Sequence, residues 1–281
     1  MSKKDQSFRL YLLENLTKFE ENYRNAVISL DEDAIHDYRV ALKKLRTLNL
    51  FLKESGLERT WLKSSLKGFK KIFKIGGAIR DFQVFKNLTR EYEIKLSTRY
   101  TTFLDYLDVQ IPLVWELFIE NSAKILSRLE KGEWKNIVGA DFGYKDNQVH
   151  LAALKFIWDK MDAANEILKE ENLDDYQLHQ IRKILKQIRF IYEMRMAEEW
   201  KKPEHQLHLE LLKKLETILG IWHDKVTMLL SLKNFLDQLS DQKEKSMYNS
   251  LEKKLIKEIK EGVIPLKPEF KKEYKWFKKL T

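Results

Sequence analysis

Four cationic or titratable side chains near residue 40 have the spacing of a single helical face. They are His36, Arg39, Lys43 and Arg46. At about 100° per residue they fall within a stripe about 80° wide that contains no acid, although exposed helix faces usually mix charges of both signs. Like charges this close repel one another unless an anion lies between them. The spacing therefore favours an anion-binding face over the alternative, a solvated charged surface.

The same stripe recurs further along the chain. Its second copy consists of His179, Arg182, Lys186 and Arg189. His36 and His179 are 143 positions apart, and a second motif, Gly77 to Asp81, recurs at the same offset as Gly220 to Asp224. Two linked motifs at one ungapped offset indicate an internal duplication.

A further basic stripe lies on the next predicted helix of the first repeat. It consists of Lys63, Lys67, Lys70 and Lys74 and ends at Asp81. In the second repeat only Lys213 and Asp224 keep these residue types. We expect Asp81 and Asp224 to orient an arginine or lysine through a charge-assisted hydrogen bond. Gly77 and Gly220 would allow close approach of a neighbouring helix, for the site or for packing alone.

The elements that must position these residues are helices. Nine Gly and four Pro in 281 residues leave little turn chemistry for a β or α/β fold, so the sequence predicts an all-α protein. Its repeats are 1–145 and 146–281, with the boundary in the loop-like stretch 132–148. Periodicity predicts helices at 5–28, 32–54, 58–98, 111–131, 149–171, 174–200, 204–239 and 243–261. Two four-helix bundles follow.

Local signals mark several helix ends. Asp31 or Asp33 is the expected cap of the second helix and Gly56 its stop, while Pro112 is expected near a helix start. In the second repeat we expect the same roles for Asp174 or Asp175 and for Pro203.

Composition excludes several classes of protein. There are 52 Lys+Arg and 43 Asp+Glu, a net charge of +9, and hydrophobic residues make up 43%, which is typical of a folded chain that favours anionic partners. The absence of cysteine excludes disulfides, Cys-ligated zinc, Fe–S clusters and thiol catalysis. The charged N-terminus is unlike a secretory signal, and no apolar run reaches the roughly 18–20 residues of a membrane span. We expect a cytoplasmic protein.

These motifs resemble the CHAD family, the conserved histidine α-helical domain, whose pattern is a His-x-x-Arg helix and a later Arg-Asp motif, given twice. The resemblance implies two pseudo-symmetric four-helix bundles that face each other across a basic central groove or pore. It also implies that this groove binds inorganic polyphosphate, without catalysis. Many relatives carry an N-terminal triphosphate-tunnel domain, and we expect none here, so no catalytic residue is predicted.

The resemblance also extends the set of predicted ligands. Arg80-Asp81 matches the Arg-Asp motif, whereas its second copy is His223-Asp224. Lys44 corresponds to Gln187, and Val40 corresponds to Lys183, so one basic residue lies at a different position on this helix in each repeat. The predicted polyphosphate-binding residues are His36, Arg39, Lys43, Lys44, Arg46, Lys70, Lys74, Arg80, His179, Arg182, Lys183, Lys186, Arg189, Lys213 and His223. Association with polyphosphate granules, for targeting or regulation, would follow.

The sequence also offers candidate residues for two other kinds of partner, a metal ion and a nucleic acid or acidic protein. Asp33 with His36, and His205 with His208, have the spacing of two metal ligands on one helical face, but the residue equivalent to Asp33 is Tyr176. We therefore predict neither a metal nor a cofactor. A helical scaffold whose basic groove binds nucleic acid or an acidic protein stays open as the alternative, although no run of base-reading Asn or Gln accompanies the arginines.

Two further expectations concern the tail and pH. Phe270, Tyr274 and Phe277 have the spacing to dock the basic C-terminal segment on the second bundle, with contact to an anion or a membrane surface as the alternative. Charged His36 and His179 would raise affinity for phosphate as the pH falls through roughly 6–7.

Overall fold

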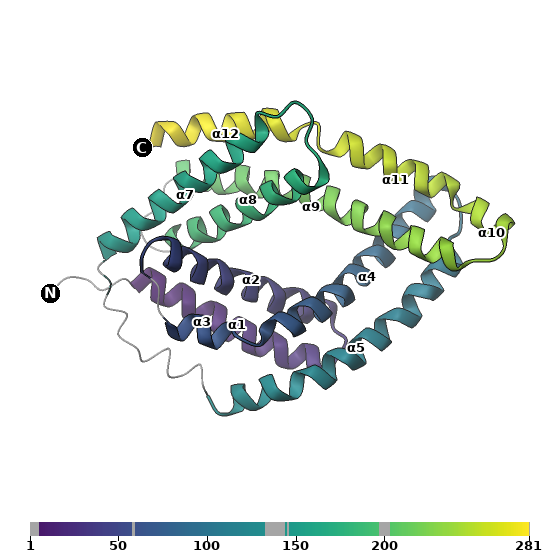
Figure 1. The fold of residues 1–281 in the computed structure, drawn as a ribbon, viewed down its shortest axis with the longest axis horizontal. Coiled ribbons are helices and arrows are strands. Elements are labelled where there is room, and N and C mark those ends of the chain that lie inside the picture. The colour runs from purple at the N-terminus through teal and green to yellow at the C-terminus, as the bar shows by residue number, and fades with distance from the viewer. Residues whose placement is uncertain (1–5, 58–59, 133–143, 145, 197–202, 281) are drawn as a thin grey trace.

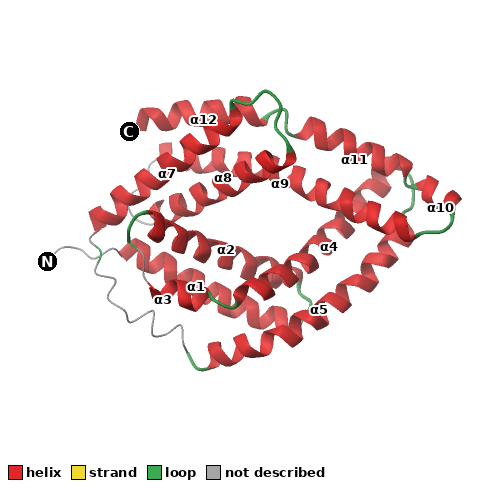
Figure 2. Ribbon diagram, in the orientation of Figure 1, coloured by secondary structure: helices red, strands yellow, loops and turns green. Residues whose placement is uncertain are grey.

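The structure is a computed structural model that describes residues 6–57, 60–132, 144, 146–196 and 203–280. Its helices are α1 (Gln6–Ile28), α2 (Glu32–Glu54), α3 (Thr60–Leu66), α4 (Phe69–Leu96), α5 (Thr101–Glu130), α7 (Asp146–Leu168), α8 (Asp175–Met196), α9 (Pro203–Gln238), α10 (Gln242–Met247), α11 (Asn249–Gly262) and α12 (Leu266–Leu280). Figure 2 shows helices and loops alone, without a strand among the residues described. The all-α prediction is confirmed. No helix in the described ranges is both long and apolar enough to cross a membrane.

Several helix ends form where the sequence predicts them. Asp31 caps α2, because its side chain accepts a hydrogen bond from the backbone N–H of Ala34 at 2.6 Å. Gly56 follows α2 with φ +69°, and the N–H of Leu57 donates back to the Leu52 carbonyl at 2.8 Å, which closes the helix in a Schellman turn. At α8, Asp174 accepts from the N–H of residue 177 at 2.7 Å, so it is the cap.

Three predicted helices differ from the structure. The range 58–98 is divided into α3 and α4, because Gly68 has φ +97° and cannot continue a right-handed helix. Pro112 lies inside α5, which begins at Thr101; the proline is exposed, so water can reach the carbonyl that loses its helical donor. The range 243–261 is likewise divided, into α10 and α11.

The helices pack in the same order in both parts of the chain. α1 lies against α2 and α4 against α5, while α7 lies against α8 and α9 against α11. The two parts also meet each other twice, through α2 with α8 and through α4 and α5 with α9 (Figure 1). The duplication itself stays a prediction, and most of its predicted boundary, 132–148, lies outside the described residues.

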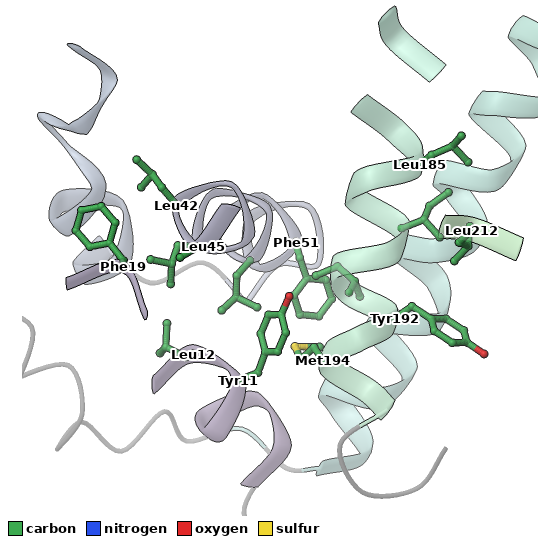
Figure 3. Packing of buried hydrophobic residues seen from close by; sticks show 14 of the residues in the cluster. Tyr11, Leu12, Phe19, Leu42, Leu45, Phe51, Leu185, Tyr192, Met194 and Leu212 are labelled. Atoms are coloured by element: carbon green, nitrogen blue, oxygen red, sulfur yellow. The ribbon is translucent and has the colours of Figure 1, made fainter. Parts of the chain in front are cut away.

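Two apolar clusters hold these junctions. The larger cluster joins α1 and α2 to α8 and α9, and Figure 3 shows Tyr11, Phe51, Tyr192 and Leu212 among its members. The smaller cluster includes Tyr92, Phe103, Phe235, Tyr248 and Leu255 and lies where α4 and α5 meet α9 and α11. Each fully buried large side chain contributes about 1.5–3 kcal/mol. The clusters therefore fix α2, α4, α8 and α9 around the region between them.

The C-terminal segment folds back as α12 on α7 and α9, which confirms the predicted docking. Phe270 and Phe277 are buried, and the Phe277 ring packs edge-on against Trp158 of α7 at 4.8 Å between ring centres. The Tyr274 hydroxyl donates to Asp162 at 2.6 Å. The aromatic face of the tail is therefore occupied by the protein itself.

Candidate anion-binding pocket

A pocket of about 570 Å³ lies between α2 and α4 on one side and α8 and α9 on the other. It is lined by His36, Arg39, Lys43, Arg46, Thr47, Phe73, Arg80, Asp81, Val84, His179, Arg182, Lys183, Lys186, Gln187, Phe190, His223 and Asp224. The first predicted stripe and, except for Arg189, the second one meet here. The carboxylates of Asp81 and Asp224 are the acids that the described lining contains.

The basic stripes reach the pocket because the opposite faces of their helices are buried. On α2, Leu45 and Leu48 are fully buried, and on α8 Ile181 and Ile188 are fully buried. Along an α-helix, apolar residues spaced by three or four positions form one stripe, which leaves the polar residues on the other face. The polar faces of α2 and α8 therefore turn toward the pocket, with the exception of Arg189.

Phe73 of α4 supports two arginines of the first stripe. The guanidinium carbons of Arg39 and Arg46 lie 4.6 and 4.2 Å from its ring centre, within the range of a cation–π interaction. Arg39 Nη1 also donates to the Phe73 carbonyl at 2.5 Å. Phe73 is not predicted from the sequence, because nothing in its spacing distinguishes it from a core phenylalanine.

A glycine makes room for this arrangement. A Cβ added at Gly77 of α4 would lie 2.8 Å from Arg39 Nη1, closer than real contacts allow. At Gly220, the equivalent position of α9, a Cβ would meet no atom within 4 Å. Gly77 therefore lets α4 approach Arg39 closely, as expected for a glycine that serves the site. Gly220 has no such contact among the described residues.

Most pocket cations have no carboxylate partner. Arg39, Lys43, Arg46, Arg182 and Lys186 form no salt bridge with any residue that the structure describes, and Arg182 Nε is buried without a hydrogen-bond acceptor there. Buried donors are normally paired, so this arrangement is typical of a site that receives an acceptor from a ligand.

Burial and mutual repulsion weaken the proton affinity of these groups. The pKa of Lys186 is lowered to about 8, first by burial and then by Arg182. The pKa of Lys43 falls well below its ordinary value through burial and the charge of Lys186. Burial also lowers the pKa of Arg39 and of Arg182, although an arginine stays charged. A bound anion would relieve this repulsion and favour the protonated lysines.

The two carboxylates face the cations without bonding to them. Asp81 lies in the field of Arg39 and Asp224 in that of Arg182, but neither carboxylate makes a hydrogen bond within the described part of the chain. Burial raises the pKa of both groups, and the arginines oppose that effect. The charge-assisted hydrogen bond expected from the sequence is therefore not formed.

The histidines differ between the two sides. His36 is exposed, with its Nδ1 2.9 Å from Asp37 Oδ1, whereas the His179 and His223 rings lie 5.5 Å apart inside the pocket. Burial and nearby cations lower the pKa of His179, and they lower that of His223 to about 4. In the free protein His179 therefore gains its proton at more acidic pH than an ordinary histidine, so the expected rise in affinity extends below pH 6–7 and stays a prediction.

Five predicted ligands do not line the pocket. Arg189 Nε lies 2.5 Å from Glu216, and Arg189 also pairs with Glu193. Lys44 pairs with Glu193 at 3.0 Å, so carboxylates neutralise both cations. The three others are exposed outside the pocket: Lys70, Lys74 and Lys213.

The residues considered as metal ligands lie in ordinary surroundings. His205 Nδ1 is 2.8 Å from the Tyr192 hydroxyl, and His208 is fully buried beside Glu273 of α12. Asp33 and His36 are exposed. Within the described ranges no group of three or more His, Cys, Asp or Glu side chains has the arrangement of a metal site.

Comparison with known proteins gives a family and a fold. A family model described as the CHAD domain matches residues 10–233. Among solved structures, one titled "Crystal structure of the CHAD domain from the plant Ricinus communis" aligns with a TM-score of 0.64, over 100% of this chain and 93% of that one. The two are 14% identical, so this likeness concerns the fold alone. No curated protein matches the sequence.

Proposed function

The chain belongs to the CHAD domain family, and from that premise we propose that it binds inorganic polyphosphate without catalysis, in the pocket between α2, α4, α8 and α9. One observation carries the proposal. Arg39 and Lys43 from one side and Arg182 and Lys186 from the other converge without carboxylate partners among the described residues. In this reading the two sides are pseudo-symmetric bundles that arose by duplication, and the pocket is the basic groove between them.

The chemistry of the lining favours a linear phosphate chain. Polyphosphate is a flexible polyanion with no base edges, so arginine forks and lysine charges suffice to recognise it. Cations on opposing helices can neutralise a repeating anion from two sides at once. A cytoplasmic protein that associates with polyphosphate granules would follow from this function.

The direct test is a competition experiment. Long-chain polyphosphate, single-stranded DNA and duplex DNA would be titrated against the full chain at one fixed ionic strength. We expect polyphosphate to bind at least about tenfold more tightly than either DNA, with an affinity that falls steeply as salt rises, because counterions are released. Equal binding of DNA would favour the alternative, a helical scaffold for nucleic acid, and binding of neither would favour an acidic protein partner.

The lysines predict how affinity changes with pH. Lys186, with a pKa of about 8 in the free protein, binds the polyanion better when protonated. Affinity is therefore highest below pH 8 and falls as the pH rises above 8, and a bound anion raises the pKa of this group. We expect a loss of about tenfold between pH 7 and pH 9.5, since each deprotonating group contributes up to tenfold per pH unit.

The control for this pH profile is a variant in which both lysines are replaced by arginine, which stays charged over the whole range. In Lys43→Arg/Lys186→Arg the profile between pH 7 and pH 9.5 should become nearly flat. A flat profile in the unmodified protein would mean that these lysines do not contact the ligand.

A further inference from the structure

A second basic pocket lies outside the central one, between α2 and α3. Its cations are Arg46 and Lys53 of α2 and Lys63 and Lys67 at α3. None of the described residues that line it carries a carboxylate. The function proposed above does not use this pocket.

Arg46 joins the two pockets, because it lines both of them. Its guanidinium lies on the face of Phe73 and forms no ion pair within the described ranges, so its N–H edges are available to an anion. A phosphate chain bound beside Arg39 and Lys43 can therefore continue past Arg46 without meeting an acid among the residues described.

The other repeat closes the equivalent route. Arg189 occupies the position of Arg46, but Glu216 stands where the first repeat has Phe73, and it pairs with Arg189 at 2.5 Å. Glu193 adds a second carboxylate at the position of Leu50. An anion leaving on that side would find the nearby cations, Arg189 and Lys44, already paired with these two carboxylates.

The cations that surround Arg46 in the second pocket are also missing from the second repeat. Lys53, Lys63 and Lys67 correspond, at the 143-residue offset, to Met196, Gln206 and Glu210. The basic pocket therefore has no counterpart in the sequence of the second repeat. The two repeats therefore differ in two ways: Arg46 lies on a phenylalanine where Arg189 is paired with acids, and three lysines follow in the first repeat alone.

We propose that Arg46, Lys53, Lys63 and Lys67 form a second anion-binding subsite, which holds the phosphate units of a polyphosphate chain that extends from the central pocket on the α2–α3 side. This subsite rests on the proposed function, because it binds the same ligand. It distinguishes long chains from short ones: a short chain is held by the central pocket, and a long chain occupies both.

The test compares two probes, tripolyphosphate and long-chain polyphosphate. In Lys53→Gln/Lys63→Gln/Lys67→Gln we expect the affinity for long chains to fall about tenfold, while the affinity for tripolyphosphate stays within about twofold. For long chains, the slope of log affinity against log salt concentration should become shallower by about two, because fewer counterions are released. The three lysines are exposed, so the fold should be unaffected.

The matched control removes the same charge elsewhere. Lys253→Gln/Lys257→Gln/Lys260→Gln changes three exposed lysines of α11 and should leave both affinities nearly unchanged. A triple α2–α3 variant that behaves like this control, or that weakens both probes equally, would overturn the subsite while the central site stands. If the unmodified protein binds neither probe, the proposed function fails and the subsite fails with it.

Discussion

Replacing Arg39 and Arg182 together with alanine is expected to weaken long-chain polyphosphate binding by about 100-fold or more, because hydrogen bonds to charged groups contribute about 1.5–3 kcal/mol each. The two guanidinium groups approach the pocket from opposite sides, and neither has a carboxylate partner among the described residues. The measurement is a titration at fixed, near-physiological salt. Folding should persist, because removing Arg182 also removes repulsion from Lys186.

Two companion variants make this result specific. Lys18→Ala/Lys155→Ala removes the same charge from exposed helical pairs of α1 and α7 and should change affinity little. Arg39→Lys/Arg182→Lys keeps the charge but loses the planar fork, so it should bind with intermediate affinity. If the alanine pair bound as well as the Lys18/Lys155 control, the ligand would have to lie outside this pocket.

The parts of the site that the sequence predicted are those with local causes. Asp31 and Gly56 act within one turn of the helix that they end, so α2 has the predicted bounds, 32–54. The stripes depend only on helical periodicity, and Arg39 and Arg182 consequently point where periodicity placed them.

The parts that were missed depend on contacts between helices. Arg189 is neutralised by Glu216 of α9, a partner that no local pattern identifies. Glu193, four residues after Arg189, was a local signal, since residues at that spacing form helical salt bridges. Phe73 supports Arg39 only because α4 lies against α2, and Gly68 divides a helix whose periodicity continues across the break.

The pocket needs a rigid frame of helices and cations that are held in position. Two adjacent glycines of α4 serve these two needs, Gly76 by packing on the core and Gly77 by contacting a pocket arginine. Gly76 lies against Tyr38, whose ring is fully buried among Tyr23 and Phe118. Gly77 lies against the end of the Arg39 side chain. A methyl group at either position probes a different requirement, because a buried ring cannot move away, whereas an arginine at the edge of a pocket can.

Gly76→Ala is therefore expected to lower the free energy of unfolding by about 1–3 kcal/mol, the usual cost of overpacking. Its Cβ would lie 1.6 Å from Tyr38 Oη, so α4 must shift away from α2. Urea unfolding measures the change. The helix preference of alanine, about 0.8–1 kcal/mol, offsets only part of it.

Gly77→Ala is expected to have the reverse profile. Stability should stay equal or rise by up to about 1 kcal/mol, while polyphosphate affinity falls about fivefold to tenfold, because Arg39 must leave its position on Phe73. Gly220→Ala, at the equivalent position of α9, should gain stability at unchanged affinity, since its Cβ meets no atom of the described residues within 4 Å. Equal affinities in Gly77→Ala and Gly220→Ala would mean that the position of Arg39, as distinct from its charge, does not matter for binding. A lower affinity in Gly77→Ala than in Gly220→Ala would instead mean that binding depends on how closely α4 approaches α2, because that distance fixes the position of Arg39.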